Sequence, residues 1–206
     1  MAMLIFFGSV FIISISGALQ PGPVTATAIT LGTQNKWAGT LLAIGHGIIE
    51  FPLMVIIILG MGKYFELQKV QIGIGLAGGF FLLLMAIQIF MNLKSDTDTG
   101  SKALHKKPVL AGIILTASNP YFLLWWATVG LKLAQEAKGF GIWAFGIFAI
   151  VHWSVDLIWL MFLSWISCKG STFIGRKGFT YILAFCGFML LVFGLRFLYK
   201  AIVLLF

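Results

Sequence analysis

The sequence predicts an all-α membrane protein with six transmembrane helices, arranged as two inverted repeats of three helices. The first observation is composition: 60% of the 206 residues are hydrophobic and 10% are charged, whereas soluble proteins carry about 25% charged residues. The second is pattern, because the apolar stretches are continuous and do not alternate like the strands of a membrane barrel. The third is that each half of the chain holds three apolar stretches with corresponding features.

The first repeat, residues 1–91, holds predicted spans at residues 2–31, 37–60 and 70–91. The first span is too long to cross as one straight helix, because thirty residues measure about 45 Å against a hydrocarbon core of ~30 Å. Pro21-Gly22-Pro23 interrupts it. Since proline cannot continue the hydrogen-bond ladder of a helix, we expect helix 1 to be broken there.

The second repeat, residues 108–206, follows a polar connection at residues 92–107. Its predicted spans are residues 108–131, 140–166 and 179–205. Asn119-Pro120 interrupts the first of these, so helix 4 of the protein is expected to be broken as well.

A histidine stands four residues before a carboxylate once in each half. His46 precedes Glu50 in the second span, and His152 precedes Asp156 in the fifth, 106 residues later. Positions i and i+4 share one face of a helix. Because each half has an odd number of spans, the second half must cross the membrane in the opposite direction. Broken segments at matching positions of an inverted repeat indicate a transporter binding site.

The basic charge of the chain indicates membrane anchoring and excludes a nucleic-acid-binding protein. The formal net charge is +8, but lysine and arginine are scattered through short connections and form no basic stripe. Their slight excess in the odd-numbered connections favours both termini outside. Cys168 and Cys186 fit neither a disulfide framework nor a metal-binding spacing, and no cofactor is expected.

The first helix break has the chemistry of a substrate site. Pro21 and Pro23 lack amide hydrogens, so the carbonyls of Gly17 and Leu19 are expected to lose their helical donors. The half-helix that follows presents free amides near Thr25, which suits an anionic group such as a carboxylate. We therefore predict substrate binding at Gln20, Pro21, Gly22, Pro23 and Thr25. The alternative is a structural proline kink.

The second break offers a comparable site. Asn119-Pro120 is expected to free the Thr116 carbonyl, and the Asn119 amide brings both donors and acceptors to membrane depth. Asn119 and Pro120 are therefore predicted to bind substrate, the alternative being an interhelical hydrogen bond that holds the bundle. The nearby aromatic residues Tyr121, Phe122, Trp125 and Trp126 fit a substrate box, but they also fit packing or the membrane interface.

A charged carboxylate at membrane depth has a high free-energy cost. Glu50 and Asp156 are therefore candidates for a functional role. They can act as protonated hydrogen-bonding groups, as proton-coupling carboxylates or as ligands for a substrate amine. Burial and a neighbouring imidazolium act in opposite directions on a carboxyl group, so each pair can titrate near neutral pH, with His46 and His152 as the tuning groups. A metal site from these four residues is chemically possible, but no zincin-type spacing supports it, and none is predicted.

The order and spacing of these motifs resemble the LysE-type amino-acid exporter family over essentially the whole chain. The matching features of the first half are Pro21-Gly22-Pro23, then Gly39, Gly45 and Glu50, then Leu76-Ala77-Gly78-Gly79 with Leu82. Those of the second half are Gly112 with Asn119-Pro120, then Asp156-Leu157-Ile158-Trp159, then Gly187 with Gly194. The resemblance implies a six-helix, inverted-repeat exporter of the plasma or inner membrane that is driven by the proton-motive force.

This chain departs from the family pattern beside the predicted site. Tyr121 stands where many members have a lysine after Asn-Pro, and the pair of His46 and His152 is not a feature of the family at large. No substrate can therefore be carried over from a named member.

The functional prediction is a secondary transporter, not an enzyme, that exports amino acids or related small zwitterionic metabolites. The alternative is an exporter of divalent metals or other cations with the same architecture. The expected partners are a small-molecule substrate and the lipid bilayer, and a homodimer stays open.

Overall fold

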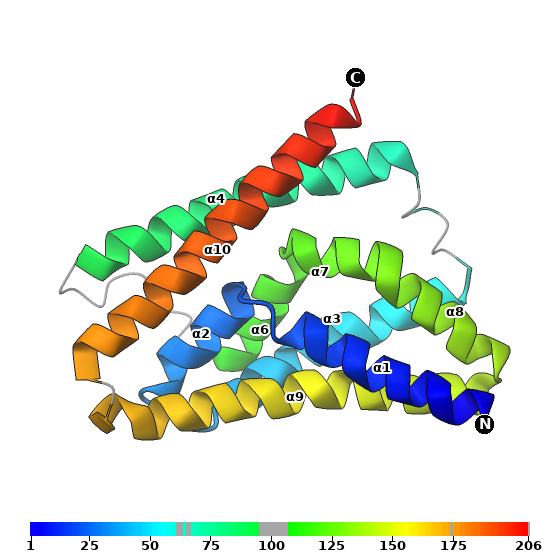
Figure 1. Ribbon diagram of the computed structural model, residues 1–206, viewed down its shortest axis with the longest axis horizontal. Helices are drawn as coiled ribbons and strands as arrows, with labels where there is room; N and C mark the ends of the chain where they lie inside the picture. The colour runs from blue at the N-terminus through cyan, green and yellow to red at the C-terminus, as the bar shows by residue number, and fades with distance from the viewer. Residues whose placement is uncertain (61–63, 65–66, 95–106, 174, 206) are drawn as a thin grey trace.

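Helices make up all the regular structure of the described residues in the computed structural model, and no strand occurs among them (Figure 1). The structure describes residues 1–60, 64, 67–94, 107–173 and 175–205. The first-half helices are α1 (Ala2–Ala18), α2 (Pro23–Gly32), α3 (Ala38–Ile58) and α4 (Gln68–Lys94). The second-half elements are α6 (Pro108–Ala117), α7 (Pro120–Trp125), the π-helical segment η2 (Trp126–Gly130), α8 (Leu131–Gly139), α9 (Ile142–Phe173) and α10 (Gly175–Val203).

Four helices are long and apolar enough to cross a membrane, namely α3, α4, α9 and α10. Two further pairs qualify if each bent pair counts as one span, which gives up to six. α1 and α2 are bent by 71°, and α6 is bent by 57° from the segment Tyr121–Gly139. Pro23 and Pro120 each stand at the first position of the second helix in their pair, where the missing amide costs no helical hydrogen bond.

Two carbonyls that the sequence predicted to be free at the breaks are in fact satisfied. The Gln20 amide donates to the Gly17 carbonyl at 3.1 Å, and the Asn119 amide donates to the Thr116 carbonyl at 3.1 Å. α1 and α6 each end in a tighter turn, in which an amide bonds the carbonyl three residues earlier. This amide replaces the donor that proline lacks. The prediction of free carbonyls at Gly17 and Thr116 was therefore wrong.

Helix ends also differ from the predicted spans. Residues 132–139 were assigned to a connection but belong to α8, because Leu131, Ala134 and Ala137 recur at helical spacing and are buried. α9 continues to Phe173, and α4 continues to Lys94 into the predicted polar connection. Residues 95–106 of that connection lie outside the described residues.

The distribution of polar and apolar side chains is that of a membrane protein. Large apolar side chains are exposed on the outer faces of the long helices, for example Phe80 on α4, Trp143 and Ile150 on α9, and Phe188 on α10. The buried polar residues are Ser14, His46, Glu50, Thr116, His152 and Ser164. Lipid suits the exposed apolar surface, and the buried polar residues must find partners inside the protein.

Glycines let two neighbouring helices approach α3 closely. A Cβ atom at Gly45 would lie 2.1 Å from the Val109 carbonyl oxygen of α6, and one at Gly112 of α6 would lie 2.3 Å from the Leu42 carbonyl oxygen of α3. On the other side, a Cβ atom at Gly39 would lie 1.8 Å from the Leu160 carbonyl oxygen of α9. Small residues permit this backbone contact, which fixes α3 between α6 and α9.

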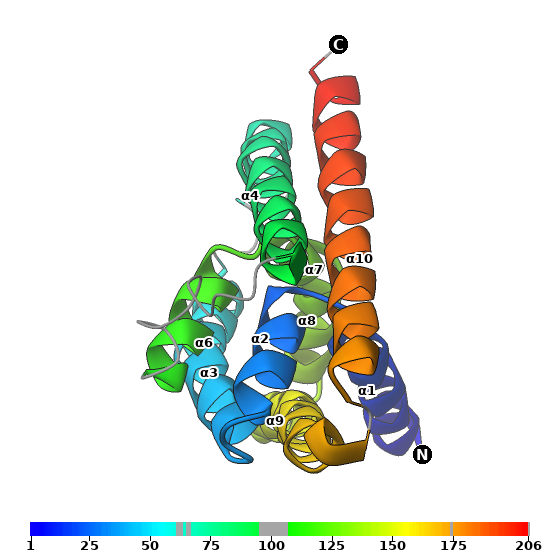
Figure 2. The same cartoon turned by 90° about the vertical axis from the view of Figure 1, so that its left-hand side faces the viewer.

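α4 and α10 lie side by side and form a pair at one side of the other helices (Figure 2). Glycines again set their separation, because a Cβ atom at Gly79 would lie 2.9 Å from the Gly194 carbonyl oxygen. Leu82 of α4 and Leu190 of α10 are buried and face the cavity described below.

Candidate substrate site

One cavity joins the two helix breaks. Its volume is about 100 Å³, and because ~10–15 Å³ of such space is enough for one water molecule, it has room for a small organic molecule. The predicted site residues that line it are Gln20, Pro21, Gly22, Pro23, Thr25, His46, Glu50, Asn119, His152 and Asp156. Pro120 directly follows Asn119 as the first residue of α7.

The breaks themselves have defined polar contacts. Asn119 caps α7, because its Oδ1 accepts a hydrogen bond from the Tyr121 amide at 3.1 Å. This bond leaves the NH₂ group of Asn119 as the donor of its side chain. At the other break, the Thr25 hydroxyl donates to the Gln20 carbonyl at 3.4 Å, which ties the first turn of α2 to the end of α1.

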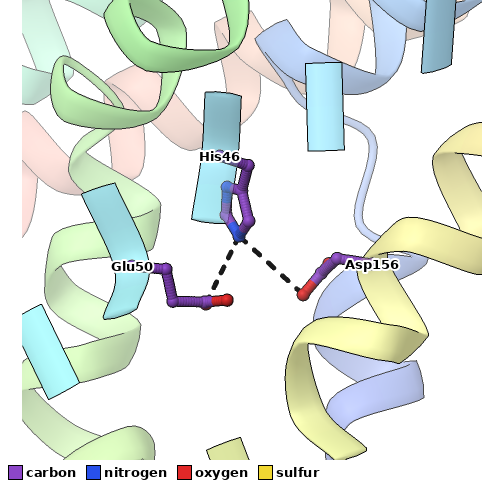
Figure 3. Close-up of side chains that lie close together, drawn as sticks. All are labelled: His46, Glu50 and Asp156. Carbon is purple, nitrogen blue, oxygen red and sulfur yellow. Dashed lines mark ion pairs between the residues drawn. The ribbon is translucent and has the colours of Figure 1, made fainter. Parts of the chain in front are cut away.

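Two carboxylates and two imidazoles meet at the cavity wall. Within α3, His46 Nε2 lies 3.3 Å from Glu50 Oε1. His46 Nε2 also lies 3.8 Å from Asp156 Oδ2 on α9, and Figure 3 shows His46 between the two carboxylates. His152 Nε2, from α9, lies 3.3 Å from the same Glu50 oxygen. The i and i+4 spacing brings His46 to Glu50 locally, but packing of α3 on α9 brings His152 and Asp156 to them.

Glu50 is 1% exposed, and its two oxygens have different surroundings. Oε1 faces both imidazole Nε2 atoms and accepts a hydrogen bond from the Trp126 indole at 3.2 Å. Oε2 is buried and has no hydrogen-bond partner among the described residues. An unsatisfied buried carboxylate oxygen is costly, so this atom is suited to a proton, a water molecule or a ligand.

Each imidazole uses its other nitrogen to bond a hydroxyl from a different helix. His152 Nδ1 lies 2.7 Å from Ser14 Oγ on α1, and His46 Nδ1 lies 2.9 Å from Thr116 Oγ1 on α6. Ser14 and Thr116 are 1% and 0% exposed.

Aromatic rings enclose the histidines. The Trp125 ring stacks on His152 with centroids 4.8 Å apart, and the Phe122 ring meets His46 edge-on at 5.2 Å. Tyr121, Phe122, Trp125 and Trp126 all line the cavity. Trp126 begins the π-helical segment η2, and such segments are frequent at functional sites. The aromatic cluster that the sequence left open therefore forms part of the cavity wall.

The chain matches the model of the LysE type translocator family over residues 15–201. It belongs to this family. No curated protein and no solved structure matches the chain significantly. The resemblance stated from the motifs is thereby confirmed, and the chain is a multi-pass membrane protein of a transporter family.

The sequence analysis missed three site residues of this LysE-family chain. Ser14 and Thr116 gave no signal beyond being hydroxyl residues close to the two breaks. Trp159 stood in a family motif without an assigned role, yet it lines the cavity and its indole nitrogen is buried without a hydrogen-bond partner among the described residues. A buried donor of this kind is suited to a polar ligand atom.

The histidine and carboxylate side chains at the cavity wall are of the types that bind metal ions. One ligand atom each from His46, Glu50 and Asp156 lies within 4.8 Å of the others. Ligand atoms of a tetrahedral zinc site lie roughly 3.3–3.4 Å apart, because each sits ~2.0–2.1 Å from the ion. The contacts of both histidines with Glu50 have this length, whereas the 3.8 Å between His46 and Asp156 is longer.

Proposed function

We propose that this LysE-family protein exports amino acids or related small zwitterionic metabolites across the plasma or inner membrane, driven by the proton-motive force. The observation that supports it best is the single cavity that joins both helix breaks to Glu50 and Asp156. A zwitterion needs donors for its carboxylate and an acceptor for its amine within a few ångströms of each other, and this cavity wall provides both.

The substrate carboxylate is assigned to the helix breaks. Among the described residues, no Lys or Arg lines the cavity, and the two imidazoles that line it face Glu50, so the carboxylate is assigned to neutral donors. The candidates are the free amides at the start of α2, the NH₂ group of Asn119 and the unpartnered indole N–H of Trp159.

The substrate amine is assigned to Asp156. Its side chain is 19% exposed, against 1% for Glu50, so Asp156 is the more accessible of the two carboxylates. Glu50 also lines the cavity, but its Oε1 already faces two imidazoles and an indole. We therefore assign Glu50 to the proton and His46 and His152 to its tuning.

Two inverted repeats, residues 1–91 and 108–206, are proposed to build the site. The contacts between the halves support this assignment, because they are reciprocal: Ser14 of the first half bonds His152 of the second, and Thr116 of the second half bonds His46 of the first. In transporters with inverted repeats, rocking of one repeat against the other exposes such a site to each side in turn.

The test is Glu50→Gln in proteoliposomes loaded with a mixture of amino acids. Glutamine keeps the size and polarity of the side chain but cannot take a proton, so gradient-driven efflux should stop while the protein still inserts and elutes as a folded species. Glu136→Gln is the matched control, because Glu136 is exposed on α8. Wild-type efflux with unchanged pH dependence in Glu50→Gln would reduce Glu50 to a structural residue.

A second candidate function is the export of a divalent metal or other cation, which the converging atoms of His46, Glu50, Asp156 and His152 favour. The double change His46→Gln, His152→Gln separates the two candidates, because an amide cannot rebuild a metal site at equal affinity. An amino-acid exporter should keep substantial efflux in this variant with a displaced pH optimum. Loss of all efflux, together with a rise of the wild-type melting temperature in zinc, cadmium or manganese, would favour the cation exporter.

A further inference from the structure

We propose that Ser14 and Thr116 are positioning residues that hold the two buried imidazoles with their Nε2 atoms toward Glu50 and stay bonded to them in both protonation states. The observation is the pair of hydroxyl–imidazole contacts across the halves, 2.7 Å for Ser14 with His152 and 2.9 Å for Thr116 with His46. Only the transport part of the test rests on the proposed function.

These two hydroxyls differ from others on the helices. Ser9, Thr30 and Thr128 donate to carbonyls of their own helix three or four residues back, as helical hydroxyls commonly do. Ser14 and Thr116 instead reach a histidine on another helix, and both are almost completely buried.

The chemistry on the other side of each ring fixes which nitrogen carries the proton. Glu50 Oε1 lies 3.3 Å from Nε2 of both rings. The His46 contact is an ion-pair approach, because His46 Nε2 has no partner with hydrogen-bond geometry among the described residues. A carboxylate can only accept hydrogen bonds and attracts an N–H group. In the neutral imidazole the hydrogen therefore belongs on Nε2, and Nδ1 is an acceptor. The hydroxyl of Ser14 or Thr116 then donates to Nδ1.

A hydroxyl group is suited to this place because it can reverse its role. When the imidazole takes a second proton, Nδ1–H becomes a donor, and the same oxygen accepts after rotation of the hydroxyl hydrogen. Nδ1 of each ring therefore keeps its hydrogen-bond partner in either state, and no helix has to move. A carboxylate at either position could only accept, and an amide would have to turn its whole terminal group by about 180° to exchange its roles.

The ionisable groups that share this environment come from few elements. His46 and Glu50 lie on α3, His152 and Asp156 lie on α9, and Tyr121 of α7 lines the same cavity. α1 and α6 contribute the hydroxyls of Ser14 and Thr116 at these contacts. A change of either hydroxyl therefore acts on the coupled titration of the four His and acid side chains.

The first test reads the tautomers directly, by ¹⁵N-histidine NMR of the full-length protein in lipid bilayers at the alkaline end of a titration. The wild type should show protonated Nε2 and hydrogen-bonded, unprotonated Nδ1 for both buried histidines, with His46→Gln and His152→Gln used to assign the signals. Signals from protonated Nδ1 in both rings would overturn the inference, whatever the protein transports.

The second test uses variants that remove or keep the hydroxyl. Thr116→Val should change the His46 signals, Thr116→Ser should restore them, and Ser14→Ala should change the His152 signals. The pH midpoint of efflux should move by about half a unit or more in Ser14→Ala and Thr116→Val, since one pH unit corresponds to a tenfold change in proton binding.

The controls are Ser9→Ala and Thr128→Val, whose hydroxyls bond only within their own helices in this structure. They should leave the histidine signals and the pH midpoint unchanged. Unchanged histidine signals in both Ser14→Ala and Thr116→Val, or a Thr116→Ser variant that behaves like Thr116→Val, would overturn the proposal. A wild type that shows the expected tautomers but exports no amino acid would instead overturn only the proposed function.

Discussion

The contact between α3 and α6 leaves no space for a side chain at Gly45. A Cβ atom there would lie 2.1 Å from the Val109 carbonyl oxygen and 2.9 Å from the Ile113 amide nitrogen. The neighbouring atoms are backbone, so no flexible side chain can move aside. Gly45→Ala therefore forces the two helices apart, and we expect it to disturb the candidate site one residue away at His46.

The size of the displacement follows from the geometry. α6 must move by about 0.9 Å for the new Cβ atom to reach 3.0 Å, the separation below which real Cβ contacts essentially never occur. The same movement would lengthen the 2.9 Å contact between His46 Nδ1 and Thr116 Oγ1 by up to about 0.9 Å, which weakens or breaks the hydrogen bond. Overpacking and the weakened imidazole contact together should cost about 2–6 kcal/mol of stability.

The assay is a pair of measurements on purified protein: the melting temperature in detergent and the rate of efflux from proteoliposomes. Gly146→Ala is the matched control, because a Cβ atom at Gly146 of α9 has no heavy atom within 4 Å. We expect Gly45→Ala to melt below the wild type and to export slowly, and Gly146→Ala to match the wild type in both. Wild-type melting and efflux in Gly45→Ala would show that α3 and α6 do not pack as described.

Three further changes test other contacts. Trp126→Phe removes the indole donor at 3.2 Å from Glu50 Oε1 and should lower the melting temperature, whereas Trp143→Phe, at a ring that is 86% exposed, should not. Trp159→Phe removes a buried donor that has no partner among the described residues. The half-saturating substrate concentration of efflux should rise, with little change in maximal rate or melting temperature. An unchanged half-saturating concentration would show that Trp159 does not bind the substrate. Gly79→Ala would place Cβ 2.8 Å from Leu198 Cγ and 2.9 Å from the Gly194 carbonyl oxygen, a milder overlap than the 2.1 Å at Gly45, so its melting temperature should fall between those of Gly45→Ala and Gly146→Ala.

Much of the helical architecture could be predicted from the sequence because membrane depth restricts the choices. Long apolar stretches must be helices in lipid, and proline limits where a helix can continue. The free-energy cost of a carboxylate in lipid also identified Glu50 as a candidate functional residue. In the structure Glu50 is 1% exposed. These arguments use only the type of a residue and its neighbours along the chain, so they need no knowledge of the tertiary structure.

The details of the breaks could not be predicted in the same way. The absence of a proline amide indicates that a carbonyl loses its usual donor, but not which other amide replaces it. At Gly17 and Thr116 the replacement came from Gln20 and Asn119, through a tighter last turn. The length of α8 was missed for a related reason, since Lys132 and Lys138 indicate a connection while the apolar spacing around them favours a helix.

The partners of the two His-acid pairs illustrate what only tertiary structure can decide. Spacing alone pairs His46 with Glu50 and His152 with Asp156, each within one helix. In the structure His46 contacts both carboxylates, and His152 contacts Glu50 of the other half of the chain. Any movement of α3 relative to α9 must therefore change the contacts of His152 with Glu50 and of His46 with Asp156, while the contact of His46 with Glu50 persists within α3. Protonation of the imidazoles strengthens all three contacts, so the charge on this cluster and the relative position of the two helices are linked quantities.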